Sequence, residues 1–237
     1  MSERIVMPEP IVMIPGLTCT AELYAPQWRS LGAGRQVLVA EHRIDDSMGA
    51  ITERLLAAAP ARFALCGLSM GGYLAFEVMR RAPERVTRLA LLDTSAKPPT
   101  PESNALRMEM VALAEGGQIE RVMAMMWQRL VAPARREDQA LRDIVRRMAL
   151  ETGPEAFVRQ QRAIMGRPDS RKGFAAIRVP TLVLVGTEDI LTPVAESEEI
   201  TAGIAGARLV KIPGCGHLST LESPDTVTAA LREWLGE

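Results

Sequence analysis

Six short runs of aliphatic residues recur along this chain, and each ends in a turn signal such as glycine, proline or aspartate. Their apolar character is nearly continuous, without the alternation of a half-exposed strand, which is typical of strands buried on both faces of a parallel sheet. The runs are IVMI (11–14), QVLVA (36–40), RFALC (62–66), TRLALLD (87–93), TLVLVG (181–186) and ARLVKI (207–212).

Helical periodicity marks several of the segments between these runs, as in residues 48–60, 71–83 and 223–235. The last of these begins with Ser223 at the expected N-cap and Pro224 at the first helical position, a favoured combination. Because strands alternate with helices along the chain, the pattern predicts a doubly wound α/β fold with right-handed crossover connections.

One long interval, between Asp93 and Thr181, interrupts this alternation and contains only helical patterns. The proline-rich stretch 97–103 and the turn-rich stretch 166–173 are typical of connections into and out of an insert. We therefore expect a core formed by residues 1–96 and 174–237, with a helical cap insert over residues 97–173. Within the insert, apolar residues share one helical face at Ile119, Val122, Met123, Met126, Trp127 and Leu130, and again at Ala140, Leu141, Ile144, Val145 and Met148.

The composition of the 237 residues argues against several classes of function. The net charge is −1, so no basic surplus is present to neutralise nucleic-acid phosphates, and no apolar run is long enough to cross a bilayer. Three widely spaced cysteines, Cys19, Cys66 and Cys215, predict reduced thiols in a cytoplasmic protein. No metal-spaced cluster or phosphate loop occurs, so we expect no metal and no cofactor, only a small-molecule substrate, and the oligomeric state is left open.

The pentapeptide GLSMG, residues 67–71, lies directly after an expected strand and directly before an expected helix. It fits the G-x-S-x-G nucleophile elbow, in which a strained turn exposes the serine hydroxyl above the sheet. Gly67 and Gly71 would be needed there because neighbouring backbone passes too close for a Cβ atom. We therefore predict that Ser69 is a nucleophile, and not a serine in an ordinary glycine-rich turn.

A serine nucleophile needs a base, and the chain has two histidines. His42 follows a strand in the polar sequence EHRIDD and is expected at the surface, whereas His217 lies among small residues after the last strand. We predict His217 as the base, because ligands of open α/β sheets bind beyond the carboxyl ends of the strands. Asp189 is favoured as the acid that orients the base, and Asp93, which also follows a strand, is the alternative.

Acyl transfer also requires two donors for the oxyanion that develops on the substrate. The backbone amide of Met70, directly after the nucleophile, is the first expected donor. The second is the backbone amide of Leu17, in the loop after residues 11–14, where Gly16 permits a close approach.

Three motifs together, GLSMGG, GTEDILTP and GCGHLSTLESP, resemble those of the α/β-hydrolase superfamily, and the resemblance spans almost the whole chain. The serine, aspartate and histidine occur in that family's order. Residues 66–96 are similar to the esterase and enol-lactonase branch, which carries a helical cap at the position of the insert. Two departures are the Pro15-Gly16 pair, where the family usually has His-Gly with a bracing imidazole, and the missing opening pair of strands. The resemblance implies a mostly parallel sheet of six or seven strands with a shortened N-terminus.

Residues and resemblance together predict a serine hydrolase that cleaves a small to medium, largely apolar carboxylic ester through an acyl-enzyme on Ser69. A lactonase, thioesterase or carbon–carbon hydrolase could use the same residues, and a non-catalytic ligand-binding relative is the alternative from a different class. No fixed charge in the insert obviously marks an anionic substrate. The insert is rich in methionine, at Met108, Met110, Met123, Met125, Met126 and Met148. Most of these are expected to pack the cap against the sheet, and a few to face an apolar cleft over Ser69, which methionine suits.

Overall fold

Six parallel strands form the sheet of the computed structural model, which describes residues 8–237. Their order across the sheet is β2-β1-β3-β4-β5-β6. Each strand coincides closely with one of the six apolar runs, so the predicted doubly wound α/β class is confirmed. The strands are β1 (Ile11–Ile14), β2 (Val37–Val39), β3 (Phe63–Leu68), β4 (Val86–Leu92), β5 (Thr181–Gly186) and β6 (Arg208–Ile212).

Helices cover both faces of this sheet, which explains why the strands are apolar throughout. Along β1, Met13 packs into the cluster shared with α1 and α9, whereas Val12 and Ile14 pack into the cluster shared with α2, α3 and α7. This alternation follows from successive strand residues pointing to opposite faces. The core helices are α1 (Ala25–Leu31), α2 (Met48–Ala58), α3 (Met70–Arg81), α7 (Val194–Gly203), α8 (Ser219–Glu222) and α9 (Pro224–Leu235), with short 3₁₀ turns η1 (Ala21–Tyr24) and η2 (Pro83–Arg85).

Two details of the helices differ from the sequence-based expectations. Helices α1 and α7 were not expected from the sequence. Helix α7 buries only Ser197 and Ile200, too few residues to give a helical pattern of apolar positions. Pro224 begins α9 as expected, but the Ser223 hydroxyl caps no backbone amide. It donates instead to Thr226 Oγ1 at 3.0 Å.

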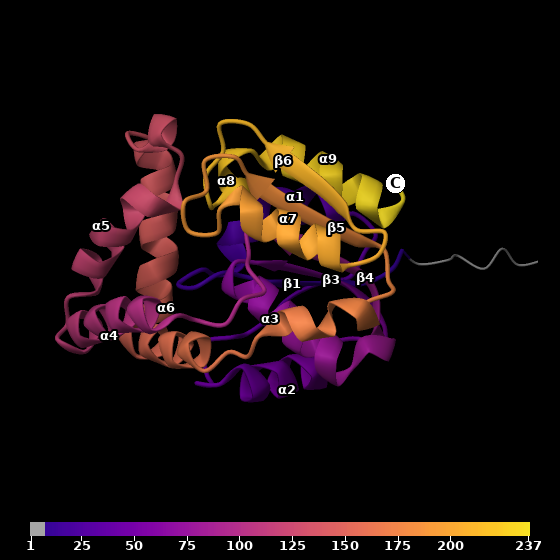
Figure 1. Cartoon of the computed structure of the whole chain (residues 1–237). Helices are drawn as coiled ribbons and strands as arrows, with labels where there is room; N and C mark the ends of the chain where they lie inside the picture. Colours follow the sequence, from indigo (N-terminus) through magenta and orange to yellow (C-terminus); the bar gives the residue numbers. More distant parts are fainter. Residues whose placement is uncertain (1–7) are drawn as a thin grey trace, which may run out of the picture.

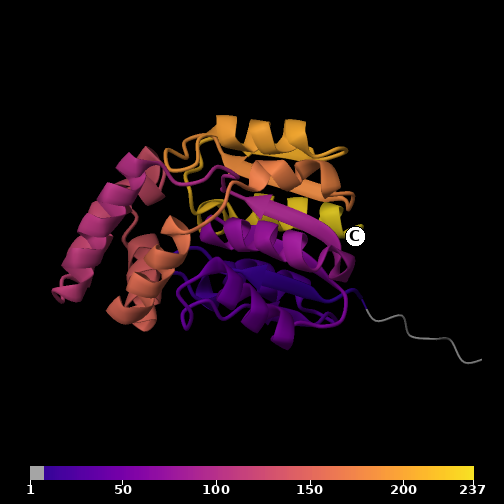
Figure 2. The same ribbon diagram turned by 60° about the horizontal axis from the view of Figure 1, so that its bottom comes forward.

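The segment between β4 and β5 is helical, as the sequence predicted, and its three long helices gather at one end of the sheet (Figures 1 and 2). We refer to α4, α5 and α6 as the cap; α6 is kinked at Gly153, where φ is 74° just before Pro154. The expected boundary at residue 173 falls inside η4 (Ser170–Ala176), which packs on α3 and α7. The division into core and cap stays a prediction. The remaining elements are α4 (Pro101–Glu115), α5 (Ile119–Leu130), η3 (Pro133–Arg135) and α6 (Gln139–Met165).

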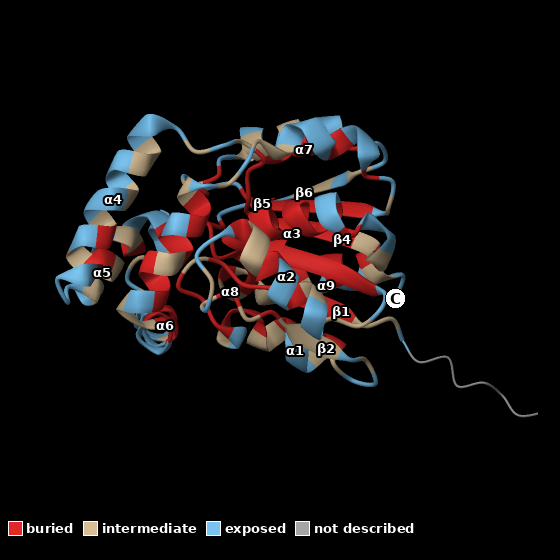
Figure 3. Cartoon of the chain, turned by 90° about the horizontal axis from the view of Figure 1, so that it is seen from below, coloured by how far each residue is buried: buried red, intermediate tan, exposed pale blue. Residues whose placement is uncertain are grey.

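Burial differs between the sheet and the cap (Figure 3). The central strands β1, β3 and β5 are buried along their whole length, whereas α4 buries only Val111 and Ala114. Helix α4 is therefore the exposed outer part of the cap, and its two buried residues pack with Val122, Phe157 and Val158 of α5 and α6. Within residues 8–237, no helix is both long and apolar enough to cross a membrane.

Candidate active site

Ser69 lies in the tight turn between β3 and α3, with its backbone in the sparsely populated positive-φ region at φ 56° and ψ −114°. A residue with a Cβ atom adopts such a conformation only where its surroundings hold it there. Two hydrogen bonds do so: the Ser69 amide donates to Leu92 O at 3.0 Å, and Thr94 Oγ1 donates to Ser69 O at 2.8 Å. The turn therefore has the geometry of a nucleophile elbow.

The glycines two positions on either side of Ser69 are required by close backbone contacts. A Cβ atom on Gly67 would overlap the carbonyl group of Gly71, and one on Gly71 would overlap the carbonyl group of Ile14. Backbone groups in a strand and a helix cannot rotate away as a side chain can. Helix α3 consequently packs closely on the sheet and directs its positive N-terminal end toward Ser69.

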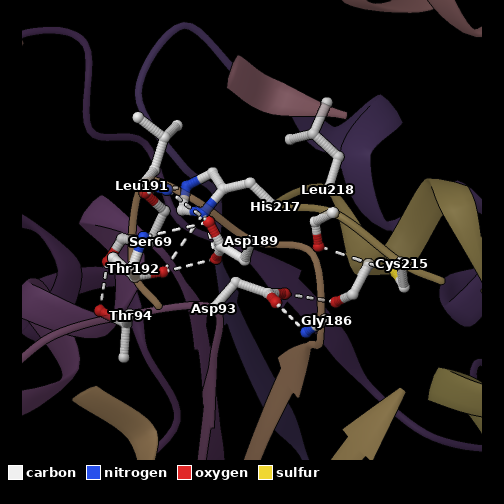
Figure 4. Close-up of polar contacts among 12 residues, drawn as sticks. Ser69, Asp93, Thr94, Gly186, Asp189, Leu191, Thr192, Cys215, His217 and Leu218 are labelled. Carbon is white, nitrogen blue, oxygen red and sulfur yellow. Dashed lines mark hydrogen bonds and ion pairs between the residues drawn. The ribbon is translucent and has the colours of Figure 1, made fainter. Parts of the chain in front are cut away.

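Ser69, His217 and Asp189 meet at the carboxyl ends of β3, β6 and β5 (Figure 4). His217 Nε2 lies 2.8 Å from Ser69 Oγ, and His217 Nδ1 lies 2.7 Å from Asp189 Oδ2. His217 and Asp189 are buried, whereas Ser69 is half-buried. Because an ionised carboxylate only accepts hydrogen bonds, Asp189 keeps the imidazole proton on Nδ1. Nε2 is then free to accept the proton of the serine hydroxyl.

Asp189 is held by more groups than the sequence suggested. Its Oδ1 accepts from the amides of Leu191 at 2.8 Å and Thr192 at 3.0 Å, and its Oδ2 accepts from Thr192 Oγ1 at 2.6 Å. Burial opposes ionisation of this carboxyl, but the charge and hydrogen bond of His217 and the bonds from Thr192 outweigh it and lower its pKa. Thr192 was not predicted from the sequence, although aspartate side chains commonly bond to the backbone two residues further on in such turns.

The hydrogen bond between His217 and Asp189 also changes the pKa of the histidine. Burial disfavours the charged imidazolium, but the carboxylate of Asp189 and its hydrogen bond outweigh burial and raise the pKa of His217 above its ordinary 6.5. The pair therefore consists of a carboxylate that stays ionised and an imidazole that takes up a proton readily, as a general base must.

Asp93, the alternative acid, lies at the end of β4 and makes no hydrogen bond to His217. Its Oδ1 accepts from the Gly186 amide at 3.0 Å, and its Oδ2 is bonded to the Ser219 hydroxyl. Burial and the nearby charge of Asp189 raise the pKa of Asp93 to about 8. At neutral pH Asp93 is therefore mainly an uncharged acid that joins β5 to the start of α8.

The two backbone amides expected to bind an oxyanion flank Ser69. Met70 is the first residue of α3, and Leu17 follows β1 in the neighbouring loop. Within residues 8–237 neither amide donates a hydrogen bond to another protein group. The loop that carries Leu17 is strained at the next residue, Thr18, where φ is 59°. Both amides are thus free to donate to another group, and their role as oxyanion donors stays a prediction.

His42 was expected at the surface, and that prediction is wrong, because only 2% of the residue is exposed. Its Nε2 lies 3.0 Å from Gly16 O, and since a carbonyl only accepts, the imidazole donates this hydrogen bond. Burial lowers the pKa of His42, so the ring is neutral. Gln160 of the cap makes a second hydrogen bond to the same loop, because its Oε1 accepts from the Thr18 amide at 3.1 Å. His42 thus supplies the bracing imidazole that Pro15 does not.

Glu222 fixes the loop that carries His217. This carboxylate accepts hydrogen bonds from the amides of Gly216 at 3.2 Å and Leu218 at 3.1 Å, on either side of the histidine. It also accepts from the amide of Ala132 at 2.8 Å, in the connection that follows α5. Burial raises its pKa although the three amides oppose that effect. The histidine loop and the cap are therefore joined through one buried side chain.

A cavity of about 310 Å³ opens beside Ser69 and His217, between the strand ends and the cap. Of the six methionines of the insert, a few of which were expected to face a cleft, Met110 and Met126 line this cavity, whereas Met108 and Met125 are exposed. The lining of the cavity also includes charged side chains that the sequence did not single out, Arg107 of α4 and Arg129 of α5. Its apolar lining includes Leu17, Leu68, Leu130, Ile164, Leu191 and Leu218.

The fold, the elbow and the residues at the strand ends together define a hydrolase of the α/β class. The family model described as the alpha/beta hydrolase family matches residues 11–231, so this chain belongs to that family. The resemblance inferred from the motifs GLSMGG, GTEDILTP and GCGHLSTLESP is thereby confirmed.

Several relatives of this chain carry more specific names. The chain is 28% identical over 192 residues to a pimeloyl-[acyl-carrier protein] methyl ester esterase from Nitrosomonas europaea, covering 76% of this chain and 74% of the relative. The fold of this chain is similar to that of a thermophilic esterase from Thermogutta terrifontis solved with malate bound (TM-score 0.88, 28% identity, 97% of this chain and 90% of the esterase covered). It is also similar to the enol-lactonase from Burkholderia xenovorans LB400 (TM-score 0.86, 26% identity, 99% and 94%). Hydrolase activity is what these relatives share.

Proposed function

We propose that this protein is a serine hydrolase that cleaves carboxylic esters through a covalent acyl-enzyme on Ser69. The observation that carries the proposal is the continuous chain from Asp189 Oδ2 to His217 Nδ1, at 2.7 Å, and from His217 Nε2 to Ser69 Oγ, at 2.8 Å. These distances match what a base needs in order to take the hydroxyl proton as the oxygen attacks.

In the acylation step, Ser69 Oγ attacks the substrate carbonyl carbon while His217 Nε2 takes the hydroxyl proton. Asp189 stays ionised and stabilises the imidazolium that forms, consistent with its lowered pKa. Negative charge develops on the former carbonyl oxygen, where the amides of Leu17 and Met70 are free to donate. His217 then gives its proton to the departing alkoxide, and an ester bond to Ser69 remains.

In the deacylation step, a water molecule takes the place of the alcohol. His217, neutral again, removes a proton from this water as it attacks the acyl carbon, and the same two amides stabilise the second oxyanion. The proton returns to Ser69 Oγ when the acyl–serine bond breaks. The products are a carboxylic acid and the alcohol released earlier, and no cofactor enters either step.

A small to medium ester fits the cavity of about 310 Å³, and the leucines of its lining suit an apolar acyl chain. A lactone is the second candidate substrate, favoured by the similarity to the enol-lactonase structure. It would react by the same steps, with a leaving oxygen that stays tethered to the acyl group. The names of the esterase relatives favour an open-chain ester.

A covalent label and a chromogenic assay test the proposal together. We expect an organophosphonate to add one equivalent at Ser69, located by peptide mass spectrometry, and to abolish hydrolysis of p-nitrophenyl butyrate. Ser69→Ala should remove essentially all turnover, about 10⁶-fold where a triad serine has been removed elsewhere. Ser95→Ala is a matched control, because Ser95 lines the same cavity but bonds to Glu196.

The results also distinguish an enzyme from a ligand-binding relative. Label on another serine, or near-native turnover by the Ser69→Ala protein, would refute the assignment of the nucleophile. Failure of the purified wild-type protein to cleave any p-nitrophenyl or lactone substrate, with an unlabelled Ser69, would favour a binding protein that has retained the fold.

A further inference from the structure

The cavity beside Ser69 is strongly cationic, in contrast to the chain as a whole, whose net charge is −1. Four of its lining residues carry a positive charge, and Glu196 is the only acid among them. Lys97 offsets that acid directly, with its ammonium 2.8 Å from the Glu196 carboxylate. The surplus positive charge in the lining therefore belongs to three arginines, which are Arg107, Arg129 and Arg167.

Arg107 projects from α4 and is held in place by one side chain of α6. Its Nη1 donates to Gln161 Oε1 at 2.7 Å, and Gln161 is fully buried. Arg107 Nε is buried without a hydrogen-bond partner in residues 8–237, and the hydrogen-bond partner of Nη1 is the uncharged amide of Gln161. Burial, together with the charges of Arg167 and Arg129, lowers the pKa of Arg107. Arg107 itself is half-buried, and a guanidinium whose buried Nε lacks a partner is stabilised when an anion joins it.

Arg167 presents a second guanidinium from the connection after α6. Its Nε donates to Lys97 O at 3.1 Å and its Nη1 to Ile164 O at 3.2 Å, and neither of these carbonyls is charged. The guanidinium lies 4.4 Å from the ring centre of Tyr73, another cavity residue, which fixes its plane. In the described chain, the Nη2 groups of Arg107 and Arg167 donate to no protein atom.

We propose that the substrate carries a carboxylate away from its scissile ester bond, and that Arg107 and Arg167 bind this carboxylate at the cap side of the cavity. A carboxylate suits the site because two guanidiniums can each donate to one of its oxygens, and such charge-assisted bonds are the strong ones. The apolar lining would then hold the methylene chain between the two ends. The substrate class is thus the half-ester of a dicarboxylic acid. This inference rests on the proposed function for the reaction, but the binding of the anion can be measured without it.

The kinetic experiment compares esters of equal length with and without the distant charge. Mono-p-nitrophenyl glutarate and p-nitrophenyl valerate differ only in a terminal carboxylate against a methyl group. We expect the wild-type protein to prefer the glutarate half-ester in kcat/KM. Arg107→Gln and Arg167→Gln should each lower that value about tenfold to a hundredfold, mainly through KM, and leave valerate within about twofold.

Two further variants separate recognition from misfolding. Arg121→Gln is the matched control, because this exposed arginine of α5 donates to Gln118 Oε1, three residues before it in the chain, and does not line the cavity. It should leave both esters unchanged. Arg107→Lys keeps the charge but not the planar fork, so we expect partial recovery of the glutarate preference. Equal kcat/KM for the two esters in the wild-type protein, or an equal loss for both in Arg107→Gln, would overturn the proposal.

A binding measurement keeps this inference distinct from the proposed reaction. Calorimetric titration of the Ser69→Ala protein with monomethyl glutarate and with methyl valerate requires no turnover. We expect only the glutarate half-ester to bind measurably, and we expect Arg107→Gln to remove that binding. Binding without hydrolysis by the wild-type protein would refute the reaction and support the anion site. Hydrolysis by the wild-type protein, with equal affinity of the Ser69→Ala protein for the two ligands, would support the reaction and refute the anion site.

Discussion

The triad and the cap face the same cavity, but their polar side chains are held in different ways. At the strand ends nearly every polar atom has a fixed partner: Asp189 accepts from Leu191, Thr192 and His217 through both oxygens. In the cap, Arg107 has one side-chain partner among residues 8–237 and a buried Nε with no partner there. The polar groups at the strand ends therefore have their hydrogen bonds satisfied within the protein. In the cap, Arg107 keeps donors that a bound ligand could satisfy.

This contrast suggests a division between chemistry and selection. Groups that move protons must be placed before the substrate arrives, since a rate gain depends on preorganised donors and acceptors. Groups that choose a substrate can remain unsatisfied until it binds. Substitutions at the strand ends should then lower kcat by large factors for every substrate. Substitutions in the cap should have smaller effects, and these should differ from one substrate to another in kcat/KM.

The largest effect should come from the orienting carboxylate. Asp189→Asn removes the group that fixes the proton on His217 Nδ1, which lowers turnover about 10⁴-fold in the best-studied triad. Asp93→Asn should cost less than about tenfold, because Asp93, with a pKa of about 8, is already mainly uncharged at neutral pH. Steady-state hydrolysis of p-nitrophenyl butyrate by the two variants measures both. A larger loss of turnover in Asp93→Asn than in Asp189→Asn would show that Asp93, at the end of β4, is the acid that orients His217.

The next effect concerns the brace behind the oxyanion loop. His42→Phe removes the donor to Gly16 O, so the amide of Leu17 should lose its fixed direction. We expect kcat to fall about tenfold to a hundredfold, less than the 10²–10³-fold loss of a whole oxyanion donor, with KM little changed. The melting temperature serves as the control for folding. A loss confined to stability, with normal kcat in the folded fraction, would leave His42 a purely structural residue.

Much of the fold and of the triad could be predicted because both are encoded locally. The buried strands are nearly continuous apolar runs, and the elbow needs glycine at Gly67 and Gly71 whatever surrounds it. His42 could not be placed from sequence, since its burial depends on α6, more than a hundred residues away, where Gln160 contacts it. Arg107 is equally hidden: α4 is largely exposed, and no periodicity tells which of its charged residues turns toward the cavity.

A smaller, pH-dependent effect follows from the pairing of His217 with Asp189. Only the neutral imidazole can act as base, so kcat/KM should fall about tenfold per pH unit below the pKa of His217. That pKa is raised above 6.5, so the midpoint of the acid limb should lie above pH 6.5. In Asp189→Asn the residual activity should show a midpoint at lower pH. A rate that stays constant down to pH 4 would exclude histidine as the base.

The smallest effect belongs to the apolar part of the cavity. Each methylene that leaves water is worth about 0.8 kcal/mol, or roughly a fourfold gain in kcat/KM per step. Neutral p-nitrophenyl esters from acetate upward should therefore rise by about twofold to fourfold per methylene, because real pockets recover part of the transfer free energy. The rise should stop when the cavity of about 310 Å³ is full.

A cap substitution shows whether this gain comes from the cap or from the strand ends. Met126→Ser places a hydroxyl in the lining and should flatten the rise with chain length while leaving the acetate rate nearly unchanged. Met125→Ser is the matched control, because Met125 is 46% exposed and does not line the cavity. If Met126→Ser instead slows all esters equally, the cap contributes to the chemistry and the division between chemistry and selection fails. If rates fall steadily from acetate even in the wild-type protein, the lining does not bind an acyl chain, because burying methylenes would then bring no gain.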